Sequence, residues 1–312
     1  MSSHPERVAA IDVGSNTILL LIAEHDSVRG LRILEEAEDQ PRLGAGLGAT
    51  GRLSPESMER ALRSLTRMLD LCRSRGVTRI RAVATAAVRE AENGADFVRQ
   101  VRALGMDLET ISPEAEAALS YRSAIHHFPH SARTVVADIG GGSLELIGGA
   151  SRRIELIRSL PLGAVRLTEL GLPLSELQSQ VRRTLEHAIV AREWSGSQVI
   201  GSGGTFATAA AMAQAARGSP PGRSIQGVEI SRKEMEELLR RLNQMSLPQR
   251  RQVPGLRPER ADIIVAGLAV VVELLDSVGA TSAMINAYGL REGLLLEMLG
   301  LEQPPEFQSR SF

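Results

Sequence analysis

The strongest constraint on the fold is a short pattern that occurs twice, 126 residues apart. In each copy an aliphatic run ends in an aspartate and then a glycine-containing turn, IDVGSN at 11–16 and ADIGGGS at 137–143. More aliphatic residues follow each turn, whereas a dinucleotide-binding fold needs a helix of about a dozen residues there. Gly148-Gly149 interrupts the second copy after four residues. The pattern therefore predicts a β-hairpin after each turn.

Two hairpins, each opening a domain, predict a duplicated two-domain fold with a cleft between the halves. The chain alternates short aliphatic strands with amphipathic helices, which is typical of α/β proteins. Its 312 residues suffice for two hydrophobic cores. We place the N-terminal domain at 1–124 and the C-terminal domain at 125–312.

Two helices are marked clearly by their first residues. Ser54 followed by Pro55 predicts an N-cap and a helix that Gly76 ends. Ser231 and Glu234 form a capping-box pattern at the start of a second helix. A third glycine turn, VIGSGGT at 199–205, precedes a predicted helix at 206–216 whose N-terminal N–H groups suit an anion.

Composition excludes several classes of function. The net charge of −1 gives nucleic-acid binding no support. The first residues, MSSHPERVAA, lack the basic and apolar regions of a signal peptide, and Cys72 has no second cysteine with which to pair. No apolar run approaches the roughly 18 residues of a membrane span. We expect a cytoplasmic protein with no membrane role.

Lysine is almost absent, because 35 of the 36 basic residues are arginine. A Walker-type phosphate loop, a protein kinase and a Schiff-base enzyme each need a lysine at a specific place. Lys233 lies in SRKEME, in the first turn of a polar helix, and suits none of these roles. These three kinds of site are therefore excluded.

As an ordered set, nine segments resemble the Ppx/GppA phosphatases, exopolyphosphatases and guanosine pentaphosphate phosphohydrolases of the actin-like ATPase and sugar kinase superfamily, in their short two-domain form. The segments are AAIDVGSNTILLLIAE, LGAGLGATGRLS, AVATAAVREAENG, ISPEAEA, VVADIGGGSLEL, SLPLGAVRLTE, VIGSGGTFATAAAM, LRPERADIIVAG and INAYGLREGLL. The resemblance implies two ribonuclease H-like (actin-like) domains with a central cleft, and a homodimer. One departure is Leu144, where the family often has Thr.

Hydrolysis of a terminal phosphoanhydride needs charge neutralisation, a positioned water and a base. Asp12 and Asp138 end their strands and are candidates to hold Mg²⁺, which usually keeps several waters. The resemblance adds Glu145 as a further metal carboxylate. It also implies Glu116, in the first turn of the helix that Ser112 and Pro113 start, as the catalytic base, and Arg89 as a phosphate clamp.

The glycine turns are predicted phosphate-binding loops, because backbone N–H groups without neighbouring side chains can approach phosphate oxygens. The hydroxyl and amide side chains of the turns would add donors. The predicted phosphate-binding residues are Gly14, Ser15, Asn16, Thr17, Gly140, Gly141, Gly142, Ser143, Gly201, Ser202, Gly203, Gly204 and Thr205.

The leading interpretation is a Mg²⁺-dependent exopolyphosphatase that acts on inorganic polyphosphate. The alternative within the family is a pppGpp 5′-phosphohydrolase, which the 3% aromatic content disfavours because little beyond Phe206 could stack on guanine. Other classes are an ATP-dependent sugar or acetate kinase, and a regulatory protein that binds polyphosphate or alarmone without turnover. The arginines between Arg250 and Arg260 form a basic run that could guide a polyanion, although such runs are usually solvated.

Overall fold

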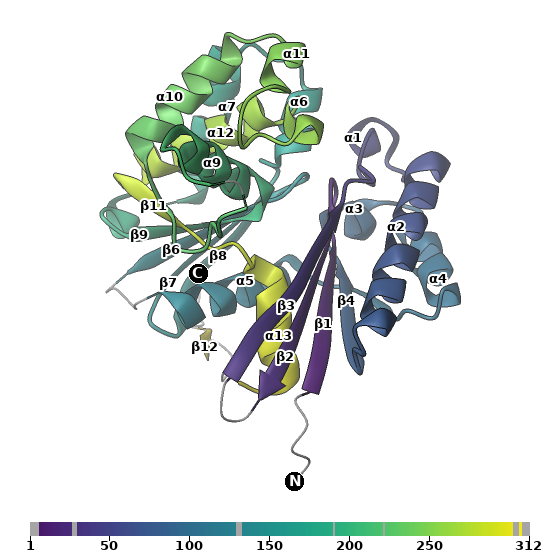
Figure 1. Cartoon of the computed structure of the whole chain (residues 1–312). Coiled ribbons are helices and arrows are strands. Elements are labelled where there is room, and N and C mark those ends of the chain that lie inside the picture. Colours follow the sequence, from purple (N-terminus) through teal and green to yellow (C-terminus); the bar gives the residue numbers. More distant parts are fainter. Residues whose placement is uncertain are drawn as a thin grey trace. The chain divides into compact units, whose positions relative to one another are not determined.

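The computed structural model describes residues 6–26, 30–128, 133–189, 191–220, 222–301 and 306–307. They form two compact units, shown in Figure 1: the chain up to Arg122 with the segment that begins at Leu290, and Ser123 to Gly289 with a short C-terminal strand. The sequence-based division placed Leu290 onward in the second domain. The structure instead assigns it to the first unit, because Arg291 Nη1 donates to Leu20 O at 3.1 Å.

The first unit is built on a five-stranded mixed sheet of order β3-β2-β1-β4-β5. β1 pairs antiparallel with β2 and parallel with β4, so the strand that carries Asp12 lies in the middle of the sheet. The strands are β1 (Glu6–Val13), β2 (Ile18–Asp26), β3 (Gly30–Asp39), β4 (Arg79–Ala84) and β5 (Leu108–Thr110).

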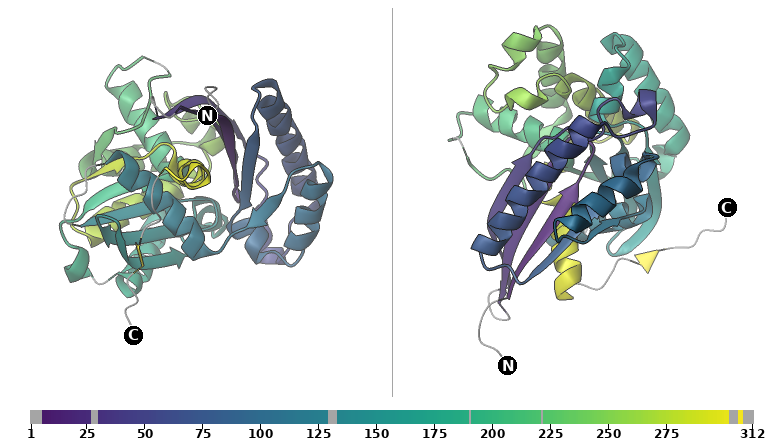
Figure 2. Two further views of the ribbon diagram at one scale, coloured as in Figure 1. Left: turned by 90° about the horizontal axis from the view of Figure 1, so that it is seen from below. Right: turned by 90° about the vertical axis from the view of Figure 1, so that its right-hand side faces the viewer.

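Helices cover this sheet, and Figure 2 shows α2 and α4 together on one face. The Ser54 cap is confirmed, since its side chain accepts from Ser57 N at 3.1 Å. Within the first unit, α13 packs closely on α5, because a methyl group at Gly293 would lie 2.1 Å from Leu119 O. The helices are α1 (Leu47–Thr50), α2 (Pro55–Ser74), α3 (Ala86–Glu90), α4 (Gly94–Ala103), α5 (Pro113–His127) and α13 (Gly289–Leu299).

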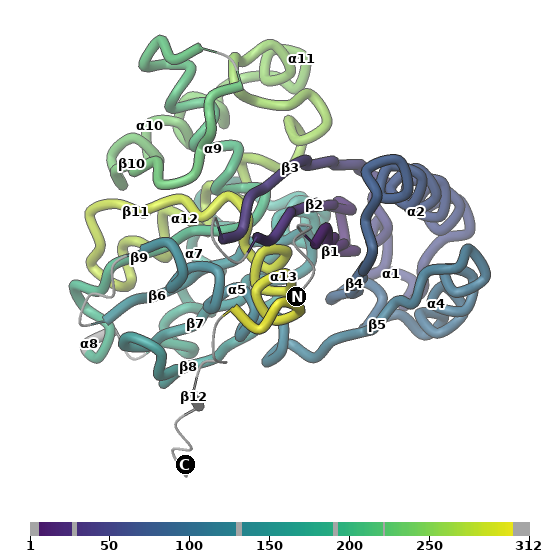
Figure 3. Tube along the Cα trace, turned by 60° about the horizontal axis from the view of Figure 1, so that its bottom comes forward, coloured from purple at the N-terminus to yellow at the C-terminus, as the bar shows by residue number. Residues whose placement is uncertain are grey.

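The second unit contains a seven-stranded mixed sheet of order β10-β11-β9-β6-β7-β8-β12. Figure 3 lets the reader follow its central strands from β8 through β6 to β11. The strands are β6 (Thr134–Ile139), β7 (Leu144–Ala150), β8 (Arg153–Leu160), β9 (Gln198–Ser202), β10 (Glu229–Ser231), β11 (Ser282–Ile285) and β12 (Glu306–Phe307).

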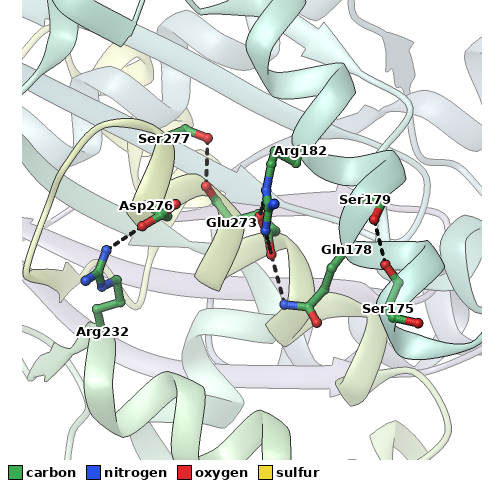
Figure 4. A network of polar contacts seen from close by, with 8 residues as sticks. All are labelled: Ser175, Gln178, Ser179, Arg182, Arg232, Glu273, Asp276 and Ser277. Atoms are coloured by element: carbon green, nitrogen blue, oxygen red, sulfur yellow. Dashed lines mark hydrogen bonds and ion pairs between the residues drawn. The ribbon is translucent and has the colours of Figure 1, made fainter.

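The core of the second unit lies between this sheet and a layer of helices that includes α7, α9, α10 and α12. The capping box at Ser231 and Glu234 is confirmed. Figure 4 shows how α7 is tied to α12: buried Glu273 accepts from Arg182 Nε at 2.9 Å and from Gln178 Nε2 at 2.8 Å. The helices are α6 (Ala164–Glu169), α7 (Leu174–Ala188), α8 (Ala191–Trp194), α9 (Gly203–Ala216), α10 (Arg232–Asn243), α11 (Leu247–Arg250), the 3₁₀ helix η1 (Pro258–Arg260) and α12 (Ile264–Ser277).

Both predicted hairpins are confirmed, and the two sheets share the strand arrangement of a duplicated α/β fold. One detail was wrong: Gly148 and Gly149 do not end the second strand but lie within β7, at a register irregularity opposite β8. Glycine is needed at 148 because a methyl group there would lie 2.4 Å from the Trp194 ring. Within the residues that the structure describes, no helix is both long and apolar enough to cross a bilayer.

Candidate active site

The first glycine turn joins β1 to β2 and begins after Val13, the residue that follows Asp12. Gly14 N–H donates to Thr17 O at 3.0 Å and closes the turn. The carbonyls of Ser15 and Asn16 accept hydrogen bonds from the backbone of a later loop, at 2.7 Å and 3.1 Å. Within the described residues, no carbonyl accepts from the N–H groups of Ser15 and Asn16. The turn therefore keeps donors available for an anion.

The second turn repeats this geometry between β6 and β7. Gly140 N–H donates to Ser143 O at 3.0 Å, which is the bond that Gly14 and Thr17 make in the first copy. Across the described chain, the N–H groups of Gly141, Gly142 and Ser143 likewise meet no backbone carbonyl. The two copies share their local hydrogen bonding as well as their sequence.

Helix α6 binds the carbonyl side of the second turn. Ala164 N donates to Gly140 O at 3.0 Å, and Arg166 donates from its backbone N to Gly141 O at 3.1 Å and from Nε to Gly142 O at 2.9 Å. Gly163, which precedes the helix, lies against the turn so closely that a methyl group there would be 2.2 Å from Gly142 C. Sequence reasoning did not single out Gly163 or Arg166, although the LPLG segment was part of the resemblance.

Two predicted metal carboxylates lie side by side in the second unit. Asp138 and Glu145 are directly paired across the antiparallel strands β6 and β7, which places their side chains on the same face. Glu145 is buried and accepts from Ser159 Oγ at 3.0 Å. In the first unit the position that pairs with Asp12 is held by Leu19, so this second carboxylate is specific to one copy.

The third glycine turn differs from its prediction, because α9 begins at Gly203 and not at Phe206. Gly203 and Gly204 form the first turn of the helix, and a methyl group at Gly203 would lie 2.7 Å from Asp138 Oδ1. A methyl group at Gly204 would lie 1.9 Å from Arg260 Nη1. The third glycine loop therefore lies next to Asp138. The Arg260 guanidinium lies next to Gly204, which is one of the predicted phosphate-binding residues.

The arginine run therefore divides into two kinds of residue. Arg250 donates from Nε to Leu242 O at 2.8 Å, and burial lowers the pKa of its guanidinium. Its side chain therefore ties the end of α11 to α10. Arg260 is the member that lies at the glycine loop. The spacing of the run alone could not separate them, since each is the last residue of a short helix in a polar segment.

Glu116 and Arg89 form an ion pair in the first unit. Arg89 Nη1 lies 3.0 Å from Glu116 Oε2 and also donates to Ile111 O at 2.9 Å. The predicted cap of α5 is confirmed, because Ala115 N donates to Ser112 Oγ at 3.2 Å. Glu116 is buried at 8% exposure, whereas Glu114 is exposed. Hydrogen bonds from its own backbone N–H and from Ser112, with Arg89 nearby, lower the pKa of Glu114.

The comparisons with known proteins identify the family. The model of the Ppx/GppA phosphatase family matches residues 21–302. The chain belongs to the Ppx/GppA phosphatase family. A protein named Exopolyphosphatase 2, from Mycobacterium tuberculosis, is 33% identical over 332 aligned residues, which cover 94% of this chain and 99% of the relative.

Solved Ppx/GppA structures have the same fold. An exopolyphosphatase from Cytophaga hutchinsonii superposes with a TM-score of 0.87 at 25% identity, and the Aquifex aeolicus Ppx/GppA protein with a TM-score of 0.79 at 27% identity. Each comparison covers 96% of this chain and 99% of the other. The two-domain actin-like fold and the resemblance seen in the sequence are confirmed, and membership makes the chain a phosphoanhydride hydrolase.

The predicted site residues of this Ppx/GppA chain fall into three groups. Asp12 lies with the first turn, Asp138 lies with the second turn, Glu145 and the third glycine loop, and Glu116 lies with Arg89. Their roles in catalysis stay predictions.

The oxygen atoms of these groups fit a hard cation such as Mg²⁺. Asn16 Oδ1 is buried and meets no hydrogen-bond donor in the described chain, and Asp138 and Glu145 provide two carboxylates. Over the same described ranges, no three His, Cys, Asp or Glu side chains form a ready-made metal cluster. Mg²⁺ requires only one or two carboxylates when waters and substrate phosphates complete its shell.

Proposed function

We propose that this chain is an exopolyphosphatase that releases orthophosphate from the ends of inorganic polyphosphate by Mg²⁺-dependent, in-line attack of water. One observation carries the proposal: an acidic strand end followed by a turn with available N–H groups occurs twice, with the same closing hydrogen bond. The name of the mycobacterial relative, and an alignment that covers 94% of this chain and 99% of that relative, support the same substrate.

The protein's own residues would bind and orient the substrate. The N–H groups of Gly141, Gly142 and Ser143 would donate to phosphate oxygens, and Arg260 at Gly204 would add a guanidinium. Asp12, Asp138 and Glu145 would hold Mg²⁺, which when bound neutralises charge on the transferred phosphoryl group. The proposal requires both units to act on one substrate.

Glu116 is the proposed general base, and its carboxylate would take the proton of the attacking water. The sequence predicted Arg89 as a phosphate clamp, and its ion pair with the Glu116 carboxylate supports a further role. Arg89 is therefore proposed as a positioning residue. General-base catalysis of this kind contributes roughly 10²–10⁴-fold.

The alternative substrate is pppGpp. Guanine recognition by stacking would need an exposed ring, and Phe206, the aromatic residue nearest to a glycine turn in sequence, is fully buried with its ring against Gly201. Phe206 is therefore not available to stack on guanine. We also propose a homodimer in the cytoplasm, without nucleic-acid partners, and light scattering of the purified protein would test the dimer.

A phosphate-release assay on polyphosphate, pppGpp and ATP, each with Mg²⁺ or with EDTA, tests the proposal. We expect the highest kcat/KM on polyphosphate and no turnover in EDTA. Glu116→Gln should lower kcat by about 10²–10⁴-fold. Glu114→Gln is the matched control, because Glu114 lies exposed in the same helical turn, and it should keep wild-type turnover. Faster release from pppGpp would replace polyphosphate as the substrate.

A double-mutant cycle tests whether both units serve one reaction. If Asp12 and Asp138 stabilise the same transition state, the effects of Asp12→Asn and Asp138→Asn on kcat/KM should be strongly non-additive. Simple multiplication of the two losses would argue for independent sites.

A further inference from the structure

Three polar residues form a row at the carboxyl ends of adjacent strands in the second unit. Asp138 and Ser202 are paired across the parallel strands β6 and β9. Ile285 of β11 pairs with Gly201, and Asn286 N donates to Gly201 O at 2.8 Å, so Asn286 follows level with Ser202. Because residues at equal heights in parallel strands point to the same face, the three side chains project together.

Two members of this row are buried with unsatisfied atoms. Ser202 has no exposed surface and Asn286 is 2% exposed. Among the residues that the structure describes, neither Ser202 Oγ nor Asn286 Oδ1 has a hydrogen-bond partner. Asn286 Nδ2 donates to Ser123 Oγ at 2.9 Å. Buried polar atoms are nearly always satisfied in proteins, so a ligand or water is indicated.

Gly289 lies beside these atoms. A methyl group at Gly289 would lie 3.5 Å from Asp138 Oδ2 and 3.6 Å from Ser202 Oγ. Gly289 has a φ of +49°, a backbone conformation in which a side chain would be strained. An added side chain would therefore occupy space between Asp138 and Ser202.

The chemistry of the row selects its ligand. Asn286 Oδ1 only accepts hydrogen bonds, and an ionised phosphate oxygen has no hydrogen to donate. A water molecule can donate to Oδ1 and also exchange a hydrogen bond with Ser202 Oγ. Mg²⁺ dehydrates reluctantly and usually retains several waters when it binds a carboxylate.

We infer that Ser202 and Asn286 are positioning residues that hold waters of the Mg²⁺ ion bound at Asp138. The inference rests on the proposed function, because it requires that metal. It changes the role of Ser202 from phosphate binding to the orientation of metal-bound water. Asn286 becomes part of the metal site although it contributes no direct ligand.

Calorimetric titration of the folded full-length chain with Mg²⁺ tests this inference without any turnover. Outer-shell partners typically change metal affinity by about 10–100-fold, so Ser202→Ala and Asn286→Leu should each raise the Kd for Mg²⁺ by at least about 10-fold. Asn286→Asp keeps an acceptor and should restore binding. Thermal unfolding in EDTA checks that the variants fold. If Asn286→Leu does not fold, the affinity of Ser202→Ala for Mg²⁺ decides the question.

Ser197→Ala is the matched control. Ser197 is also buried, and its Oγ likewise has no partner in the described chain. It lies just before the first residue of β9, whereas Ser202 is the last residue of that strand. Its Kd for Mg²⁺ should equal that of the wild type. Wild-type affinity in both Ser202→Ala and Asn286→Leu, with weakened binding in Asp138→Asn, would overturn this inference and leave the proposed metal at Asp138 in place. Unchanged affinity in Asp138→Asn would overturn the proposed metal at that residue as well.

Discussion

Replacement of Gly163 by alanine should damage the second glycine turn without touching a predicted catalytic side chain. Gly163 has φ −72° and ψ 147°, which alanine adopts freely. Removal of glycine at such a position would by itself stabilise a protein by roughly 0.4–1 kcal/mol. Any loss must therefore come from the contact that the new methyl group makes.

The size of that contact follows from three backbone atoms. The methyl carbon would lie 2.2 Å from Gly142 C, 2.3 Å from Gly141 O and 2.4 Å from Gly141 C, whereas ordinary contacts begin at 3.4 Å. These atoms belong to the main chain and cannot rotate aside, so the turn must shift by about 1 Å. Overpacking of this kind costs about 1–3 kcal/mol of folding free energy, and a 1 Å misplacement can cost about 10²-fold in rate.

Urea unfolding and polyphosphate hydrolysis measure the two effects separately. Gly48→Ala is the control, because no atom lies within 4 Å of its added methyl group. We expect Gly163→Ala to lose both stability and about 10²-fold in kcat/KM, and Gly48→Ala to lose neither. Wild-type stability together with wild-type turnover in Gly163→Ala would refute the reasoning from close packing.

Three further perturbations have defined outcomes. Burial raises the pKa of Cys72 to about 11 from an ordinary 9.0, so the folded thiol stays protonated after the unfolded one ionises. The protonated thiol contributes about 2–3 kcal/mol to the free energy of unfolding below pH 9, and this contribution should be lost between about pH 9 and 11, as urea unfolding against pH will show; the Cys72→Ala variant should lose correspondingly less stability over this range. Arg182→Met should destabilise the chain by about 1.5–3 kcal/mol, because buried Glu273 keeps only Gln178 of these two side-chain donors, and a negligible change in the urea midpoint would contradict this. Arg260→Gln should raise KM for polyphosphate more than Arg250→Gln does, whereas Arg250→Gln should lower thermal stability more; equal effects would contradict the division of the arginine run.

Local sequence signals predicted the elements of the fold well. The caps at Ser54, Ser112 and Ser231 start helices as expected, because each depends on residues three or four positions apart. The repeated aspartate-glycine pattern predicted both hairpins for the same reason. The start of α9 was misplaced because glycine is a poor helix former, and its place here is set by the approach of Asp138 and Arg260.

Contacts between distant residues could not be read from the sequence. Arg89 and Glu116 are 27 residues apart, and no periodicity links them, so each was assigned a separate role. Asn286 and Gly163 were visible only as members of longer motifs. Their importance depends on which strands and turns become neighbours, which is a property of the tertiary fold.

Helix α6 has a consequence for the way an anion would bind to the second turn. Because Ala164, Val165 and Arg166 already donate to its carbonyls, the loop is held in shape before any ligand arrives. A preorganised receptor loses little conformational entropy on association. Phosphate should therefore displace water from the turn without a change in its backbone. Amide hydrogen exchange at Ala164, Val165 and Arg166 should already be slow in the protein without ligand.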